Sequence, residues 1–154
     1  MTTGFNTRSL HAGTEPDPDT GARATPIYQT SSYVFEDADT AADLYALREE
    51  GDVYSRVSNP TVRQLEARLA DLEGGVGAVA TASGMASLDS LTTILAQNGD
   101  NIVASSDMYG GTGSYLSTLA PRRGIEARTV PTLEYDAYAD AIDDDTAYVH
   151  VETI

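Results

Sequence analysis

The stretch GAVATASGMAS, residues 77–87, decides the fold predicted for this chain. Its first six residues form an apolar run typical of a buried strand, and Ser83 and Gly84 are turn formers. Apolar residues then recur at helical spacing from Met85 to Leu95. A strand that turns directly into a helix is the unit from which parallel α/β sheets are built.

Capped helices and apolar strands alternate on both sides of this stretch. Upstream, Asn59 suits an N-cap and Pro60 suits the first helical position, and Gly74-Gly75 marks the end of that helix. Downstream, the pattern predicts helices near residues 113–120 and 133–142 and strands over 101–105, 125–130 and 147–153. This alternation predicts an α/β fold with a mostly parallel sheet.

Residues 1–58 lack this regularity. They are rich in proline and turn-forming residues, and apart from a short helix expected over residues 39–50 they are predicted to form an irregular arm. Residues 59–154 end directly after an apolar strand. Because a strand of a buried parallel sheet needs neighbours and a covering helix, we expect residues 59–154 to be the first part of a larger domain.

The charge of the chain excludes one class of partner. It has 24 acidic residues, nine arginines and no lysine, which gives a net charge of −15. So negative a chain repels phosphate backbones, and we expect no nucleic acid partner. Its self-repulsion would be screened in molar salt, which favours a salt-loving source; an ordinary acidic protein is the alternative.

The sequence gives no sign of a membrane span, a disulfide or a metal site. No apolar run reaches the ~18 residues of a membrane helix, and MTTGFNTRSLHAG at the start is not a secretory signal. There is no cysteine, His11 and His150 are far apart, and the aspartates at 143–145 suit a solvated turn. A cytoplasmic protein without a membrane partner is the expectation.

Two stretches could bind an anion or an aromatic ligand. Ser83, Gly84 and Met85 open a predicted helix, where unpaired amides and the helix dipole favour a phosphate; the alternative is that Ser83 is only an N-cap. Tyr109, in DMYGGTG, follows the strand at 101–105, at the edge where open α/β sheets bind ligands. Its alternative is a solvent-facing ring in a flexible loop.

A third candidate is VYSRVSNPT, residues 53–61. Tyr54 and Arg56 would point to the same side of an extended segment. The guanidinium could hold a phosphate through two parallel hydrogen bonds, and the phenol could add a third. The alternative for Arg56 is a surface salt bridge.

Together these stretches resemble the pyridoxal phosphate (PLP)-dependent enzymes of Cys/Met metabolism, the cystathionine γ-synthase-like family. The resemblance runs from about Phe5 to Ile154 and is carried by HAG, PIYQTSSYVF, YSRVSNPT, LEARLADLEGG, ASGMAS, GDNIVAS, YGGT and VET, in this order. It implies an arm, residues 1–58, that contacts a neighbouring subunit. The αβα large domain of an aspartate aminotransferase-like transferase would follow.

The resemblance also implies a role for each candidate residue. Gly84 and Met85, next to Ser83, would bind the phosphate of the chain's own PLP through their amides. Tyr109 would stack on the pyridine ring and take part in proton transfer. Tyr54 and Arg56 would bind the cofactor phosphate of the neighbouring subunit in a homodimer or homotetramer. No metal is implied.

Within the family, the chain looks most similar to O-acetylhomoserine sulfhydrylases. The long arm, the spacer LYALREEGDVYSR and the ending VETI carry this likeness. Such enzymes replace the acetate of O-acetylhomoserine with sulfide or a thiol, giving homocysteine or methionine. Cystathionine γ-synthases and methionine or cystathionine γ-lyases share the same motifs and remain alternatives.

The chain departs from the family in one respect, since it has no Schiff-base lysine. The resemblance implies that this lysine holds the cofactor and moves substrate protons, so we expect residues 1–154 to be an amino-terminal fragment that is inactive alone. A non-catalytic partner subunit and a phosphate-binding module without chemistry are the alternatives from other classes.

Overall fold

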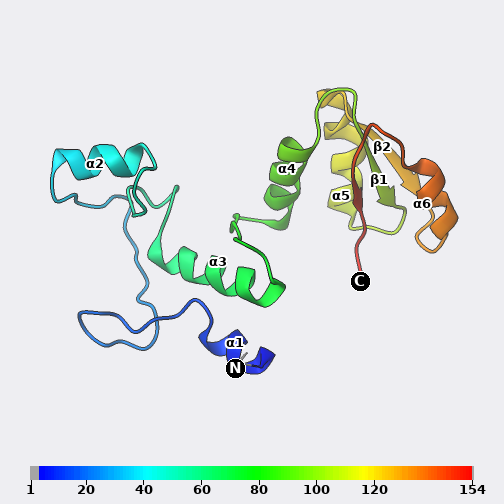
Figure 1. Ribbon diagram of the computed structural model, residues 1–154. Helices are drawn as coiled ribbons and strands as arrows, with labels where there is room; N and C mark the ends of the chain where they lie inside the picture. The colour runs from blue at the N-terminus through cyan, green and yellow to red at the C-terminus, as the bar shows by residue number, and fades with distance from the viewer. Residues whose placement is uncertain (1–3, 154) are drawn as a thin grey trace. The chain divides into compact units, whose positions relative to one another are not determined.

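The computed structural model describes residues 4–153, and these form helices and one parallel sheet. The chain divides into two compact units, Met1–Ala80 and Thr81–Ile154 (Figure 1). The sheet belongs to the second unit, whereas the described part of the first unit is helical and irregular.

Helix α3 (Pro60–Glu73) has the bounds that the sequence predicts. The Asn59 side chain accepts a hydrogen bond from the Thr61 amide at 3.0 Å, and Pro60 occupies the first helical position. Gly74 ends the helix with a φ of 69°, a conformation that costs glycine least because it has no Cβ.

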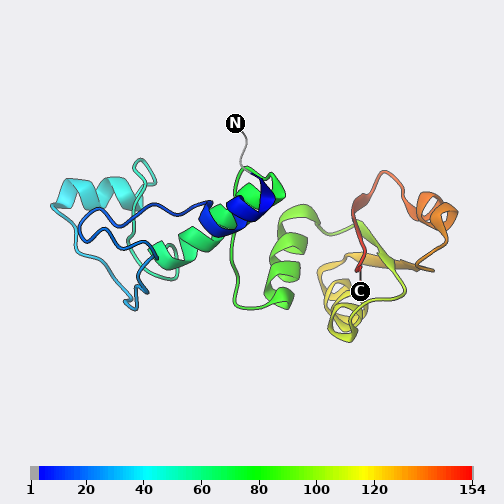
Figure 2. The ribbon, with the colours of Figure 1, turned by 90° about the horizontal axis from the view of Figure 1, so that it is seen from below.

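Helix α1 (Phe5–His11) lies beside α3 (Figures 1 and 2). Arg8 Nε is 2.7 Å from Asp71 Oδ2, and Arg68 Nε donates to the carbonyl of Ala12 at 3.0 Å. The prediction that the chain before residue 39 is irregular was wrong at α1. Seven residues show too little periodicity, and a short helix depends on tertiary contacts, here with residues about sixty positions away.

The arm beyond α1 has one isolated antiparallel bridge, Ser32 with Tyr54, and is otherwise held by side chains. Helix α2 (Ala38–Tyr45) begins after the N-cap Asp37 and is shorter than the predicted 39–50. The buried Asn59 side chain donates to the carbonyl of Tyr28 at 2.9 Å and to the hydroxyls of Ser55 at 3.0 Å and Tyr33 at 3.2 Å. One amide thus ties two segments of the arm to the start of α3.

The second unit is built on three parallel strands in the order β2-β1-β3. They are β1 (Asn101–Ser105), β2 (Glu126–Val130) and β3 (Thr146–His150). Strand β1 pairs with both neighbours and all five of its residues are buried. The strands predicted at these three places and their parallel direction are confirmed, although β3 ends at residue 150 and not at 153.

Residues 77–82, in contrast, do not form the predicted strand. An apolar run becomes a strand only where its backbone groups find partners. Strand β1 is paired on both edges, residues 77–82 do not pair with the outer edge of β2 or β3, and Val79 is 85% exposed. The prediction was therefore wrong within residues 4–153, because the pattern reports hydrophobicity and not a pairing partner.

Helices lie on both sides of this sheet (Figures 1 and 2). The core packs Leu88 of α4 (Gly84–Leu95) against Ile102 and Ala104 of β1. Helix α5 (Gly110–Ser114) completes this side with a π-helical turn (Tyr115–Leu119) and a 3-10 turn (Pro121–Arg123), so helical structure begins earlier than the predicted residue 113. Helix α6 (Tyr135–Ala141) lies on the opposite side of the strands from α5.

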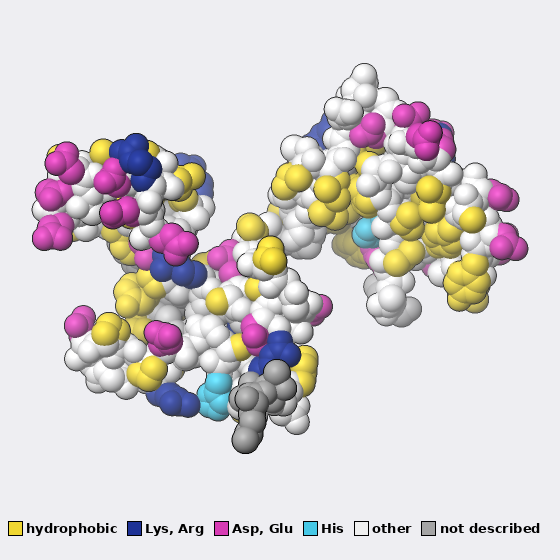
Figure 3. All heavy atoms as spheres, in the orientation of Figure 1, with side chains coloured by type: hydrophobic (Ala, Val, Ile, Leu, Met, Phe, Trp, Pro, Cys, Tyr) yellow, Lys and Arg dark blue, Asp and Glu magenta, His cyan; other side chains and the backbone are white. Residues whose placement is uncertain are grey.

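The surface is acidic and in part apolar. Acidic side chains are spread over both units on the face in Figure 3, and basic side chains are fewer. Apolar side chains also remain exposed, among them Leu65 and Leu69 on α3 and Ile94 and Leu95 on α4. Exposed apolar helix faces of this kind are typical of surfaces that another element covers.

Polar side chains fix both ends of β1. At its start, Asn101 donates to Asp143 at 2.8 Å, and the same carboxylate accepts from Arg128 at 2.5 Å. At its end, the Ser105 hydroxyl lies 2.7 Å from that of Thr132. The Arg128 guanidinium first, and then the Asn101 amide, lower the pKa of Asp143 from 3.8 to about 2.

The lowered pKa of Asp143 predicts that the free energy of unfolding depends on pH. Since its pKa is lower in the folded than in the unfolded state, its contribution is complete above pH 3.8 and is lost as the pH falls towards about 2. We expect Asp143→Asn to flatten the fall of the urea midpoint over that interval and to lower the midpoint at neutral pH. The exposed neighbour Asp144 supplies the control, because Asp144→Asn should reproduce the unsubstituted profile. A profile for Asp143→Asn as steep as the control's would contradict the assignment.

Candidate functional site

The amino terminus of α4 presents unpaired amides. The Ser83 hydroxyl caps the helix by accepting from the Ala86 amide at 3.1 Å. The amides of Gly84 and Met85, in the same first turn, have no hydrogen-bond acceptor within residues 4–153. Ser83 is thus an N-cap, and two further amides stay available for an anion.

Tyr109 stands at the carboxyl side of β1, as predicted, and is the N-cap residue of α5. The residue is 63% exposed, and its ring lies over Gly111. A Cβ added to Gly111 would meet Cε1 of this ring well inside contact distance and would lie 3.3 Å from Met85 Sδ. The absence of a side chain at Gly111 therefore leaves the space that the Tyr109 ring occupies.

One cavity of about 450 Å³ brings the candidate residues of this unit together. It is lined by Ser83, Gly84, Met85, Leu88, Tyr109, Thr112, His150 and Glu152. Helix-terminus amides, an aromatic ring and polar side chains thus face one space. Such a set can hold a phosphate at one end and a flat ring beside it.

Sequence reasoning did not single out the polar side chains that support this cavity. Glu152 accepts from the Tyr109 amide at 2.6 Å and from the Thr112 hydroxyl at 2.7 Å, and His150 Nε2 is 3.2 Å from the same carboxylate. The Thr112 hydrogen bond first, then that of the Tyr109 amide, lower the pKa of Glu152. The available signal was the position of Glu152 at the carboxyl end of the predicted strand 147–153, because that end of a parallel strand lies at the ligand-binding edge.

Tyr54 and Arg56 belong to the first unit and lie next to each other there. The Arg56 guanidinium carbon is 5.3 Å from the centre of the Tyr54 ring. The segment is not extended, because the amides of Val57 and Ser58 close a turn on the Tyr54 carbonyl. Both side chains are exposed, and no carboxylate within residues 4–153 forms an ion pair with Arg56.

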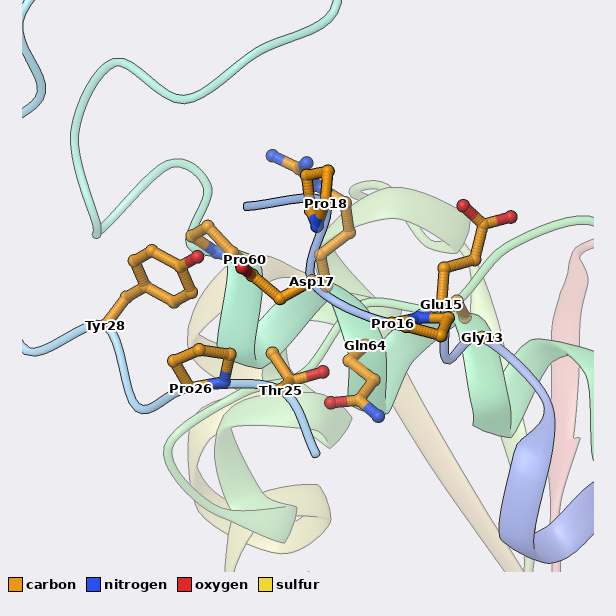
Figure 4. Close-up of a pocket in the computed structure, with 12 residues that line it drawn as sticks. Gly13, Glu15, Pro16, Asp17, Pro18, Thr25, Pro26, Tyr28, Pro60 and Gln64 are labelled. Atoms are coloured by element: carbon orange, nitrogen blue, oxygen red, sulfur yellow. The ribbon is translucent and has the colours of Figure 1, made fainter. Parts of the chain in front are cut away.

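The first unit has a pocket of its own (Figure 4). Proline rings, Tyr28 and Gln64 line it, and none of the predicted site residues is among its walls. Across residues 4–153 there is no group of three histidine, cysteine or acidic side chains that could hold a metal ion. None of the helices described is long and apolar enough to cross a membrane.

Comparison with known proteins gives the class to which this fold and cavity belong. A family model described as Cys/Met metabolism PLP-dependent enzyme matches residues 6–154. The chain belongs to this family, and its cofactor is pyridoxal phosphate.

The relatives come from bacteria and fungi. An O-acetyl-L-homoserine sulfhydrylase of Thermus thermophilus is 54% identical over 80% of this chain and 30% of its own length. A homocysteine synthase of Schizosaccharomyces pombe is 47% identical over 97% of this chain and 35% of its own. The chain therefore spans about a third of the length of the curated relatives it matches.

Solved structures agree on the fold. A Campylobacter jejuni protein assigned as an O-acetylhomoserine (thiol)-lyase matches with a TM-score of 0.88 and 38% identity, over 96% of this chain and 36% of its own. Its structure contains N'-pyridoxyl-lysine-5'-monophosphate. The metB protein of Corynebacterium glutamicum matches with a TM-score of 0.86, also at 38% identity, over 96% of this chain and 37% of its own. The predicted fold class, an α/β fold with a parallel sheet like that of PLP-dependent transferases, is thus confirmed.

Because the Tyr109 ring packs on Gly111, we expect a substitution at Gly111 to weaken cofactor binding without lowering the stability of the fold. In a full-length enzyme that carries this chain, Gly111→Ala should raise helix propensity by about 1 kcal/mol and should not lower the urea midpoint. The new methyl group displaces the ring, so PLP retention measured by absorbance after dialysis should fall. Gly110→Ala is the control, because a Cβ there meets no atom within 4 Å beyond its two chain neighbours and the backbone of its own helix. Equal PLP retention in the two variants would contradict the role of this contact.

Proposed function

We propose that residues 1–154 are the amino-terminal part of an O-acetylhomoserine sulfhydrylase, which replaces the acetate of O-acetylhomoserine with sulfide or a thiol and yields homocysteine or methionine. The observation that carries the proposal is the cavity in which the α4 amides face Tyr109. The names of the Thermus thermophilus and Schizosaccharomyces pombe relatives support the substrate class.

The residues of the cavity fit pyridoxal phosphate. The amides of Gly84 and Met85 would bind the phosphate, since a dianion is favoured at a helix amino terminus and these two groups lack another acceptor within residues 4–153. The Ser83 hydroxyl keeps the helix start in place through the Ala86 amide. Bound there, the cofactor supplies an electron sink for the α and β carbons of an amino-acid substrate.

Tyr109 would serve the reaction in two ways. Its ring would pack against the flat pyridine ring, which fixes the angle at which the cofactor faces the substrate. Its hydroxyl, on a residue that is 63% exposed, would take part in moving substrate protons. Both roles need the ring to stay where Gly111 leaves room for it.

Tyr54 and Arg56 would act on the neighbouring subunit of a homodimer or homotetramer. Within residues 4–153 the guanidinium has no carboxylate partner, and it lies over the phenol, so the two can present donors to one phosphate. The Asn59 hydrogen bonds to Ser55 and Tyr28 support this by fixing the start of the turn. The arm, residues 1–58, would then be an intersubunit element.

The proposed setting is the cytoplasm of a salt-loving cell. The net charge of −15 and the absence of lysine support it, because molar salt screens the repulsion between 24 carboxylates.

The activity is tested by supplying a full-length enzyme with PLP, O-acetylhomoserine and either sulfide or cysteine. We expect homocysteine from sulfide to form faster than cystathionine from cysteine, and faster than elimination without a thiol. Residues 1–154 alone should be inactive because they contain no lysine. Faster cystathionine formation would favour a cystathionine γ-synthase, and faster elimination a γ-lyase. Turnover by residues 1–154 alone would overturn the lysine argument.

Arg56 should matter more than Tyr54 for cofactor retention in the full-length enzyme. A charge-assisted hydrogen bond contributes roughly 1.5–3 kcal/mol and a neutral one roughly 1 kcal/mol, so Arg56→Ala should release PLP more readily than Tyr54→Phe. Arg56→Lys should restore retention only in part, because an ammonium lacks the planar fork. PLP retained after dialysis is the measurement.

The proposed action across the subunit interface has its own test. Arg56→Ala subunits are mixed with subunits that lack the PLP-binding lysine. A hybrid dimer then has one site with both defects and one with neither, so activity should return in part. A mixture that exchanges subunits and yet stays as inactive as its parents would show that Arg56 does not serve the partner's site.

A further inference from the structure

Helix α5 begins without a capping side chain of its own. Its N-cap residue is Tyr109, whose side chain makes no capping hydrogen bond, whereas N-caps are usually serine, threonine, aspartate or asparagine. Three of the five helical residues are glycine, which has the lowest helix propensity apart from proline. A helix of this composition needs an acceptor from elsewhere to start at a defined residue.

Glu152, 43 residues away, provides an acceptor for the amide of this N-cap residue and so holds the start of the helix. Its Oε2 accepts from the Tyr109 amide at 2.6 Å and its Oε1 accepts from the Thr112 hydroxyl at 2.7 Å. His150 Nε2 lies 3.2 Å from the same Oε1, and the Glu152 side chain is only 18% exposed. Both oxygens are therefore engaged, and the carboxylate has little freedom to move.

Tyr109 and Glu152 also stand together between two cavities. One cavity is the site described above, and the other, of about 420 Å³, is lined by Asp107, Met108, Tyr109, Thr132, Leu133 and Glu152. Tyr109 and Glu152 are the two residues that line both. A shift of the Tyr109 backbone would therefore move the ring towards one cavity or the other.

We propose that Glu152 is a positioning residue for Tyr109: its carboxylate holds the Tyr109 backbone so that the ring stays on the cofactor side of the wall between the two cavities. This inference rests on the proposed function, in which the Tyr109 ring packs on PLP. Glu152 touches Tyr109 and Thr112, and it acts on the cofactor through them.

The test is a double-mutant cycle in the full-length holoenzyme, with PLP dissociation and the visible circular dichroism of bound PLP as readouts. Glu152→Gln keeps the shape of the side chain but places an amide donor against one of the two donors it faces. We expect it to weaken PLP binding roughly tenfold and to change the circular dichroism. In a Tyr109→Ala background the same substitution should change neither readout further, because the ring it positions is gone.

The controls separate positioning from a general loss of structure. Glu134 is exposed and makes no capping hydrogen bond at α6, so Glu134→Gln should bind PLP as the unsubstituted enzyme does. Thr112→Val removes one of the two donors and keeps the volume of the side chain. It should give a smaller weakening that also disappears with Tyr109→Ala, and it replaces Glu152→Gln if that variant does not fold.

The outcomes that overturn the inference are distinct from those that overturn the proposed function. If Glu152→Gln lowered PLP affinity by the same factor with and without the Tyr109→Ala substitution, Glu152 would only stabilise the fold. Unchanged binding in both Glu152→Gln and Thr112→Val would also reject the inference. If the unsubstituted full-length enzyme took up no PLP at all, the proposed function itself would fail.

Discussion

The burial of β1 is the constraint on which the second unit depends. All five residues from Asn101 to Ser105 are buried, so every backbone amide and carbonyl must find a partner in the protein. Parallel pairing with β2 and β3 supplies those partners on both edges. Because the strands run the same way, their carboxyl ends meet at one edge, and Tyr109 and Glu152 come together there although 43 residues separate them.

The elements that the sequence predicts best are those whose signals are local. Asn59, Pro60 and Gly74 set the bounds of α3 through capping and backbone conformation, which act within one turn. Strand β1 was equally clear, since a short apolar run between turns suits a strand buried on both faces. The residues that open α4 were identified for the same reason, because the turn at Ser83 and the helix after it follow one another directly in the chain.

The elements that were not predicted from the sequence depend on partners that lie far away along the chain. Helix α1 is stabilised by contacts with α3, and the apolar run at residues 77–82 has no strand beside it. The role of Glu152 is of the same kind, since the donors it binds lie on another element. Patterns of hydrophobicity carry no information on which segments meet, so these features could be found only from the structure.

The two sets of candidate phosphate donors differ in how the chain builds them. The amides of Gly84 and Met85 arise wherever α4 forms, because the first turn of any helix leaves its N–H groups unpaired. The placing of Tyr54 and Arg56 does not follow from regular secondary structure in this way, since the pair stands in a turn of an arm that has little of it. The hydrogen bonds of Asn59 to Tyr28 and Ser55 and a single antiparallel bridge between Ser32 and Tyr54 hold the segment there. The proposed intersubunit donors thus depend on scattered contacts of the arm, among them the buried Asn59 amide and the Ser55–Ser31 backbone hydrogen bond, whereas the proposed donors to the chain's own cofactor are ordered by the helix itself.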